Sequence, residues 1–247
     1  MIGGEKNEAF HACLCGLHWM IIGSGLIARA FGQFADDQDT VIFASGVSNS
    51  REQDPDAFAR ERDLLLKQLD GGLHLVYFGS CNVVNPGQDS PYFEHKRAME
   101  HLVSTSGSGT VFRLPQVVGR TRNPNTLTNY LRDCIVDGRS LTLWTRAQRN
   151  LIDIDDVALI ATHLLSQARK PSVLSIATPW SLAMPHLVSL FEQVLGRRAQ
   201  VELIDRGEEM HIDSAVAEGV AADIGLDFGP DYPLRVIQKY YGSAHES

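Results

Sequence analysis

The sequence predicts an α/β protein built on a doubly wound parallel sheet. From about residue 17 onward, short β-branched and aromatic runs alternate with longer amphipathic stretches. This alternation is typical of parallel strands connected by helices. A glycine-containing turn follows the first strand run, as in many such sheets. With 247 residues, 44% of them hydrophobic, the chain can form one large core, so we expect one main domain and at most a small second one.

The individual elements follow from apolar periodicity and from residues suited to helix starts. The expected strands are residues 18–23, 40–45, 73–79, 110–114, 141–144 and 172–177, with a weaker candidate at 200–204. The expected helices are residues 25–35, 55–69, 91–105, 124–137, 155–168, 183–195 and 213–224. Pro55, Pro91 and Pro124 stand at the expected first position of a helix, where a missing N–H costs no hydrogen bond.

The pattern divides the chain into three parts. Residues 1–19 lie before the first strand run and are expected to be an N-terminal extension. Residues 20–178 contain the strand–helix alternation and form the main domain. Residues 179–247 have weaker periodicity and several prolines, so we expect a small C-terminal lobe packed on the main domain.

Charge and cysteine content restrict the function. A formal net charge of −8 without a basic stripe argues against a nucleic-acid partner, because the phosphates would be repelled. The four cysteines have neither CxxC spacing nor the density of a disulfide scaffold, so we expect a cytoplasmic location. No apolar run reaches the ~18–20 residues that cross a bilayer. A small-molecule ligand fits these features best.

The segment WMIIGSGLIARAFGQF is typical of a strand, a glycine turn and a helix. Gly23, Gly25 and Ala28 fit the G-x-G-x-x-G/A pattern of dinucleotide sites, in which glycines let the backbone approach a pyrophosphate. An ordinary tight turn between a strand and a helix gives the same pattern. The motif alone therefore leaves both interpretations open.

A second group of residues indicates proton transfer. The strand HLVYFGS ends in Ser80, and Tyr92 and Lys96 lie four positions apart on one face of the helix SPYFEHKRAMEHLV. A nearby ammonium favours the ionised phenol and lowers its pKa, and a serine hydroxyl can orient the substrate oxygen. The alternative for this spacing alone is a surface tyrosine and a solvated lysine.

Together with FRLPQVVGR and RNLIDIDDVALIA, these motifs resemble the NAD-dependent epimerase/dehydratase family, or extended short-chain dehydrogenases/reductases, over about residues 20 to 170. The resemblance implies a Rossmann-like fold, NAD or NADP as cofactor, a nucleotide-sugar substrate, and a possible homodimer through helices 55–69 and 91–105. It implies a catalytic set of Ser80, Tyr92 and Lys96. It also implies cofactor binding by Gly23, Gly25, Leu26, Ile27, Ala44, Ser45, Gly46, Tyr92, Lys96, Pro115 and Val117, and substrate binding by Ser80, Cys81, Asn82, Gln116 and Arg149.

Two features of the last motif have competing interpretations. Arg149 matches an arginine that holds the substrate diphosphate in relatives, and the alternative is a surface charge. Asp153, Asp155 and Asp156 could suggest a metal cluster, but we expect one of them to cap the next helix and another to fix a loop. No metal is therefore expected.

The sequence departs from the family in two places. After the first helix, ADDQD leads directly to TVIFASG, so the second and third strands of the usual sheet are expected to be missing, which would weaken the adenine side of the cofactor site. Cys81 and Asn82 follow Ser80 where the 4,6-dehydratases carry an acidic pair, so dehydration is disfavoured.

Two functions remain open. The first is an NAD(P)-dependent epimerase or keto-reductase acting on a nucleotide sugar in polysaccharide biosynthesis, with Tyr92 as general acid/base assisted by Lys96 and Ser80. The second is a non-catalytic Rossmann-like binding protein that has lost the adenine half of the cofactor site. The shortened region motivates the second function, and the retained Ser80, Tyr92 and Lys96 speak against it.

Overall fold

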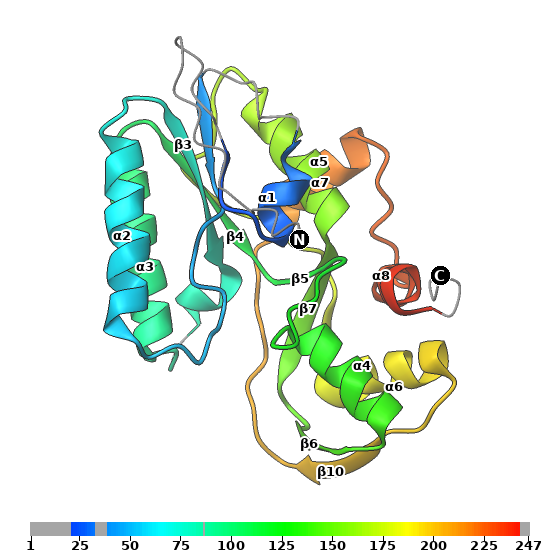
Figure 1. Cartoon of the computed structure of the whole chain (residues 1–247). Coiled ribbons are helices and arrows are strands. Elements are labelled where there is room, and N and C mark those ends of the chain that lie inside the picture. The colour runs from blue at the N-terminus through cyan, green and yellow to red at the C-terminus, as the bar shows by residue number, and fades with distance from the viewer. Residues whose placement is uncertain (1–20, 33–38, 86, 243–247) are drawn as a thin grey trace, which may run out of the picture.

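The computed structural model describes residues 21–32, 39–85 and 87–242. Its main sheet is parallel throughout, with the strand order β1-β2-β3-β4-β8, and helices cover both faces (Figure 1). The strands are β1 (Ile21–Ile22), β2 (Thr40–Phe43), β3 (His74–Ser80), β4 (Gly109–Leu114) and β8 (Val173–Ser175). The predicted α/β class with a doubly wound parallel sheet is confirmed.

The two faces of the sheet belong to different cores. Val76 and Phe78 of β3 pack with residues of α5 (Ile154–Leu165) and α7 (Ala215–Asp223), next to which lies α1 (Leu26–Ala30). Leu75 and Tyr77 face the opposite side, towards α2 (Pro55–Leu69) and α3 (Pro91–Thr105). This alternation is the period of two expected of a strand buried on both faces.

The helices α2 and α3 have the limits that the sequence predicts. Pro55 and Pro91 are their first residues, and the side chain of Asp54 accepts a hydrogen bond from the backbone N–H of Asp56 at 2.9 Å. These starts place Glu61 on α2 and Tyr92 and Lys96 on α3, with all three side chains buried against the sheet.

Strand β1 lies at the edge of the sheet in the part of the chain that the structure describes. In the usual doubly wound order, 3-2-1-4-5-6, the first strand is central. Here β1 pairs with β2 and with no other described strand. Between α1 and β2 only residues 33–38 are not described, whereas a single crossover takes at least about 10 residues. The predicted loss of the second and third strands is therefore confirmed.

A second region continues from the carboxyl end of the main sheet (Figure 1). It contains a three-stranded sheet in the order β5-β7-β9 and a parallel pair, β6 with β10. The strands are β5 (Gln116–Val118), β6 (Ser140–Trp144), β7 (Gln148–Asp153), β9 (Ser181–Ala183) and β10 (Gln200–Ile204). Helices α4 (Leu127–Asp137), α6 (Met184–Leu195) and α8 (Tyr232–Tyr241) complete its core.

This second core draws on residues from both before and after position 178, and α7 returns to the first core. The expected division of the chain at residues 178 and 179 stays a prediction. The expected N-terminal extension, residues 1–19, lies outside the described residues. Among the helices that the structure describes, none combines the length and apolar character that a bilayer span requires.

Candidate active site

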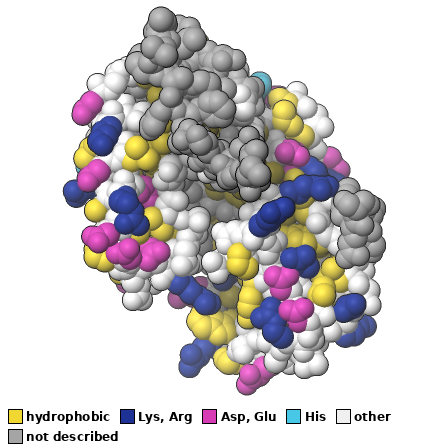
Figure 2. Space-filling view, viewed as in Figure 1, with side chains coloured by type: hydrophobic (Ala, Val, Ile, Leu, Met, Phe, Trp, Pro, Cys, Tyr) yellow, Lys and Arg dark blue, Asp and Glu magenta, His cyan; other side chains and the backbone are white. Residues whose placement is uncertain are grey.

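A cleft with a volume of about 2700 Å³ lies where the carboxyl ends of the main strands face the second region (Figure 2). Because parallel strands end at one edge, motifs that are far apart in the sequence meet there. All but one of the predicted site residues line this cleft: Gly23, Gly25, Leu26, Ile27, Ala44, Ser45, Gly46, Ser80, Asn82, Tyr92, Lys96, Pro115, Gln116, Val117 and Arg149. The structure thus brings the glycine turn, the tyrosine helix and Arg149 into one site.

Cys81 is the exception and corrects the prediction. Its side chain is buried, is not part of the cleft lining, and donates a hydrogen bond from Sγ to the carbonyl oxygen of Arg113 at 3.4 Å. Burial raises the pKa of the Cys81 thiol to about 12, so it stays protonated. The short 3-10 helix Cys81–Val84 (η2) turns Cys81 into the interior while Asn82 lines the cleft.

Three glycines along the cleft are constrained differently. Gly23 has φ +125°, and a Cβ there would lie 2.5 Å from the carbonyl oxygen of Ala44, so the turn requires glycine to pack on the end of β2. A Cβ at Gly46 would lie 2.9 Å from both Lys96 Nζ and Glu61 Oε1. A Cβ at Gly25 would meet no heavy atom within 4 Å, so the space beside Gly25 is open for a ligand.

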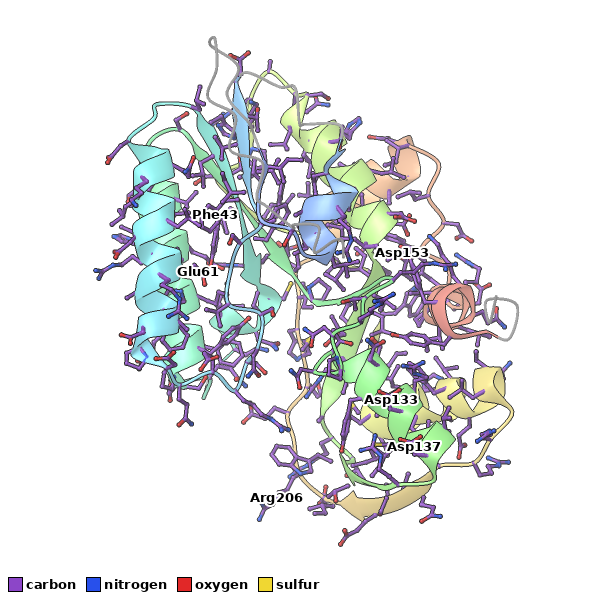
Figure 3. All side chains as sticks on the ribbon, viewed as in Figure 1. Phe43, Glu61, Asp133, Asp137, Asp153 and Arg206 are labelled. Atoms are coloured by element: carbon purple, nitrogen blue, oxygen red, sulfur yellow. The ribbon has the colours of Figure 1, made fainter. Side chains whose placement is uncertain are left out.

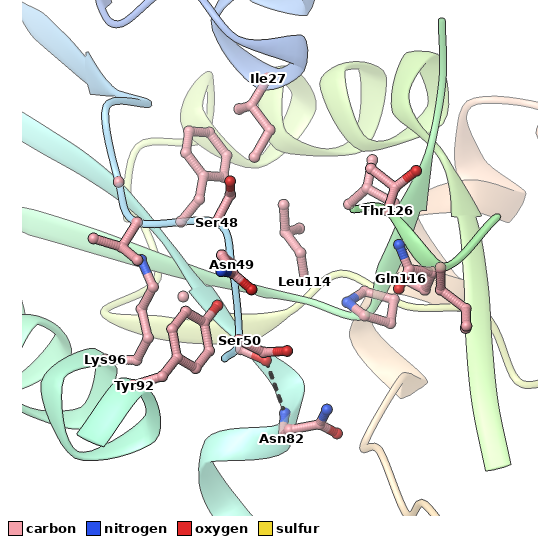
Figure 4. A pocket seen from close by; sticks show the side chains of 18 of the residues that line it. Ile27, Ser48, Asn49, Ser50, Asn82, Tyr92, Lys96, Leu114, Gln116 and Thr126 are labelled. Carbon is pink, nitrogen blue, oxygen red and sulfur yellow. Dashed lines mark hydrogen bonds between the residues drawn. The ribbon is translucent and has the colours of Figure 1, made fainter. Parts of the chain in front are cut away.

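Tyr92 and Lys96 lie side by side on successive turns of α3 (Figure 4). The Lys96 Nζ atom is 5.8 Å from the centre of the Tyr92 ring. Burial, together with the negative charge of Glu61, raises the pKa of Tyr92 to about 12. In the free protein the tyrosine is therefore held in its acid form, which is opposite to the effect expected from a lysine charge alone.

Lys96 itself is paired with groups other than Tyr92. Its Nζ donates hydrogen bonds to Glu61 Oε1 at 3.1 Å and to the Tyr77 hydroxyl at 2.9 Å. Burial lowers the pKa of Lys96, while the Glu61 carboxylate partly restores it. Figure 3 shows Glu61 on α2, near the face of the sheet that α2 and α3 cover. The lysine charge is thus neutralised beneath the cleft.

The sequence analysis missed Glu61. On the α2 helix, Glu61 and Leu65 are four residues apart on the buried face, so a lone acidic residue within an apolar stripe was the available signal. Burial by itself would raise the pKa of Glu61, but hydrogen bonds and the Lys96 charge outweigh it and lower that pKa to about 2. The carboxylate therefore stays ionised.

Ser80 ends β3 at the cleft. Its Oγ atom accepts a hydrogen bond from the backbone N–H of Asn82 at 3.3 Å, which caps the following 3-10 helix; the dashed line that ends at Asn82 in Figure 4 marks this bond. Its hydroxyl proton is not used in that bond. Ser80 can therefore donate to an oxygen atom bound in the cleft.

Three arginines line the cleft beside the second region. Arg149 donates to its neighbouring carbonyl at Gln148, and among the described residues no carboxylate pairs with it. Burial lowers the pKa of Arg149. Arg146 and Arg206, both missed by the sequence analysis, follow the paired strands β6 and β10, and Arg206 is labelled at the far end of the molecule in Figure 3. The sequence feature that could have indicated them is an arginine shortly after each of two strand runs, in TRAQR and in DRGEE.

The aspartates of β7 and α5 have structural roles. Asp153 caps α5 by accepting from the backbone N–H of Asp155 at 2.9 Å, and it also binds Lys239 Nζ at 2.7 Å. Asp156 accepts from the Tyr232 hydroxyl at 2.6 Å. The predicted helix cap is confirmed. Across the described ranges no group of three His, Cys, Asp or Glu residues is arranged to hold a metal ion.

A sequence profile of the NAD dependent epimerase/dehydratase family matches residues 39–177, more than half of the chain. The chain belongs to this family. The part of this epimerase/dehydratase that matches the profile includes Ser80, Tyr92, Lys96 and Arg149. It begins after the glycine turn. A search of curated proteins finds no match.

Solved structures show the same fold at low sequence identity. The UDP-glucuronic acid 4-epimerase from Bacillus cereus, in complex with UDP-glucuronic acid and NAD, is 16% identical with a TM-score of 0.67, over 88% of this chain and 79% of its own. The Thermus thermophilus UDP-glucose 4-epimerase in complex with NAD is 17% identical with a TM-score of 0.64, over 88% and 81%. The Bacillus anthracis dTDP-glucose 4,6-dehydratase in complex with NAD is 14% identical with a TM-score of 0.63, over 83% and 74%.

Proposed function

We propose that this family member is an NAD-dependent epimerase or keto-reductase that acts on a nucleotide sugar. The observation that carries the proposal is that Ser80, Tyr92 and Lys96 share one cleft with a glycine turn and with the three arginines beside the second region. The solved epimerases described above were determined with NAD, and one of them also with UDP-glucuronic acid. The choice between NAD and NADP is part of the test below.

The residues present fit a dinucleotide. The cleft volume of about 2700 Å³ exceeds the roughly 300–1,000 Å³ of a pocket for one small ligand, so two ligands can lie end to end. Gly23, Gly25 and the segment Ala44 to Gly46 would hold the cofactor along the strand ends. When bound, the nicotinamide supplies the hydride acceptor or donor. The fit is weaker on the adenine side, where β1 is an edge strand among the described residues.

The chain's own groups provide the proton transfer. The Tyr92 hydroxyl, held as an acid in the free protein, can donate its proton to the oxygen of a keto group, and it accepts a proton in the reverse direction. Ser80 donates a hydrogen bond to the same oxygen. Lys96, one turn further along α3, is the residue that we propose assists Tyr92 in this proton transfer. An epimerase needs proton transfer in both directions, whereas a keto-reductase needs only the transfer from Tyr92 to the keto oxygen.

The arginines suit the other half of the substrate. A guanidinium can bind a diphosphate through two parallel hydrogen bonds, and Arg149 is available for this because no described carboxylate occupies it. Arg146 is paired with Asp205 at 3.1 Å and is exposed, so it would contribute less. Dehydration stays disfavoured, because Cys81 is buried and Asn82 has no carboxyl group for elimination.

Calorimetry with NAD, NADH, NADP and NADPH, followed by incubation with UDP-sugars and dTDP-sugars, tests the proposal. We expect binding of at least one cofactor, conversion of one nucleotide sugar, and loss of that conversion in Tyr92→Phe with unchanged circular dichroism. Absence of both binding and conversion would refute the enzyme.

The open adenine side favours one second candidate, a non-catalytic binding protein. In that case Tyr92→Phe would leave the biological activity of the protein unchanged, and nucleotide sugars would bind without being converted. Three further expectations remain proposals: a domain boundary near residue 178, a homodimer through α2 and α3, and a cytoplasmic location. Light scattering at several protein concentrations tests the homodimer.

A further inference from the structure

Glu61 connects α3, the helix that carries Tyr92 and Lys96, to the loop after β2 at the cleft. It lies outside the family motifs found in the sequence. We propose that Glu61 is a positioning residue for the Tyr92–Lys96 pair: its carboxylate fixes the Lys96 ammonium beneath the loop after β2 and withholds the lysine charge from the Tyr92 phenol. This inference rests on the proposed function, because it concerns the same tyrosine and lysine.

The contacts of Glu61 come from three other parts of the fold. Oε1 accepts from Lys96 Nζ at 3.1 Å and from the Tyr77 hydroxyl at 2.9 Å, and Oε2 accepts from the Val47 backbone N–H at 2.6 Å. His95 Nε2 lies 3.0 Å from Oε2, and since a carboxylate only accepts, that nitrogen carries the hydrogen. The side chain is 2% exposed. One carboxylate thus joins α2 to the loop after β2, to β3 and to α3.

The loop lies directly on this ion pair. A Cβ at Gly46 would be 2.9 Å from both Glu61 Oε1 and Lys96 Nζ, so the backbone of the loop packs directly on the pair at this point. Because the Val47 N–H is bonded to the same carboxylate, the position of the loop and the position of Lys96 are set together. Moving Glu61 would shift both.

The surrounding charges single out Glu61 as the partner of Lys96. On β3, Tyr77 is a neutral phenol whose pKa burial raises well above its usual value. On α3, Glu100 is buried near Lys96, but its Oε2 is taken by Arg113 of β4 through two hydrogen bonds of 2.9 and 3.0 Å. Glu61 is therefore the carboxylate that is bonded directly to the lysine.

A merely structural ion pair would also be buried and hydrogen-bonded, so the test must read the state of Tyr92 itself. A nearby positive charge stabilises the ionised phenol and lowers its pKa. When the negative charge of Glu61 is removed and its shape is kept, that carboxylate no longer cancels the Lys96 charge, so the Tyr92 pKa should fall. Glu61→Gln makes this change. Glu94→Gln, on the exposed side of α3, removes the same charge where solvent screens it, and serves as the matched control.

The experiment is a pH titration of tyrosinate absorbance in the free protein, with each variant corrected by the same variant carrying Tyr92→Phe. We expect the Tyr92 midpoint to fall by about one pH unit or more in Glu61→Gln and to stay unchanged in Glu94→Gln. An unchanged midpoint in Glu61→Gln, with circular dichroism showing a folded protein, would overturn the proposal.

If Glu61→Gln does not fold, Glu61→Asp replaces it, because the shorter side chain keeps the charge but draws it back from Lys96. A lowered Tyr92 midpoint again supports the proposal, and an unchanged one overturns it. The titration needs neither cofactor nor substrate. If the Tyr92 midpoint shifts but no cofactor binds, only the proposed enzyme activity is refuted. If the protein turns over substrate with a cofactor but the Tyr92 midpoint does not shift, only the proposed role of Glu61 is refuted.

Discussion

Two glycines of the first turn occupy different environments although the sequence motif treats them alike. Gly23 needs its left-handed backbone and packs against the Ala44 carbonyl oxygen, whereas Gly25 has φ −74° and faces open space. The fold therefore requires glycine at position 23. At position 25 the absence of a side chain leaves space for a ligand.

We expect Gly23→Ala to lower the free energy of unfolding by about 1–3 kcal/mol, because alanine is strained at positive φ and would collide with Ala44. Gly25→Ala should change it by less than about 0.5 kcal/mol but weaken cofactor binding. Urea unfolding and calorimetry on both variants measure these effects. Equal destabilisation by the two substitutions would contradict this account.

Glu61 also makes the stability of the protein depend on pH. Its pKa in the folded state is about 2, against 4.5 for an unperturbed glutamate, so its contribution is present above about pH 4.5 and is lost as the pH falls towards 2. The shift corresponds to about 3 kcal/mol. We expect wild-type protein to lose much of this between about pH 5 and pH 3 in urea unfolding. Glu61→Gln should show a flatter profile, and an equally steep one would count against the assignment.

All but one of the site residues predicted from the sequence line the cleft, but the sequence did not predict the electrostatics of the site. Tyr92, Lys96 and Ser80 could be found because the chemistry requires them at recognisable spacings. The Glu61–Lys96 pair joins residues 35 positions apart, and no local pattern shows that α2 and α3 would face one another there. For the same reason the expected lowering of the Tyr92 pKa took account of the lysine and not of its partner.

Among the secondary-structure elements, α8 connects the end of the described chain to the centre of the molecule. Lys239 and Tyr240 bind Asp153, and Tyr232 binds Asp156, so the start of α5 is held by side chains more than 70 positions away in sequence. Figure 3 labels Asp153 beside this helix. The helix α8 therefore fixes the junction between β7 and α5.

We expect Asp153→Ala to destabilise the protein by about 2–3 kcal/mol, because it removes a helix cap, leaves the Tyr240 hydroxyl without its acceptor and takes one of two carboxylates from Lys239. Asp155→Ala is the matched control. Asp155 also contacts Lys239, but its side chain is 63% exposed, so the loss should be under about 1 kcal/mol. Urea unfolding compares the two variants, and similar losses would show that the cap and the buried contacts matter little.

The predicted elements differ from the structure where tertiary contacts decide. The limits of α2 and α3 agree, since proline marks their starts, but α4 begins at Leu127 instead of residue 124 because Thr126 is its cap. The short strands β5 and β9 have three residues each and gain their extended form only by pairing with β7. Helix α8 was missed although its buried residues, such as Tyr232, Val236 and Ile237, have helical spacing.

At the scale of the whole molecule, the cleft has two ends at which we propose that different ligands bind, and we expect these ends to act independently. The glycine turn and the loop after β2 belong to the main sheet, while Arg149 and Arg206 belong to the second region. Each end is supported by its own hydrophobic core. A ligand that contacts one end should therefore stabilise the protein without the other.

We expect NAD and UDP, each at about 100 times its dissociation constant, to stabilise the folded protein by about 2.7 kcal/mol. For a chain of this size that raises Tm by roughly 5–10 °C. Arg149→Ala should lose the shift caused by UDP and keep the one caused by NAD, as measured by differential scanning calorimetry. Loss of both shifts would indicate that the two ends are coupled.

The strands β5 and β7 lie between the two cores and belong to both. On β7, Leu151 packs in the second core and the next residue, Ile152, in the first, and on β5 Val118 and Val117 divide in the same way. A strand whose alternate side chains are locked into opposite interiors cannot bend as a hinge without opening one of them. The two walls of the cleft are thus joined by strands that both cores hold, so we expect the proposed ligands to be selected by whether their length spans the gap between the walls.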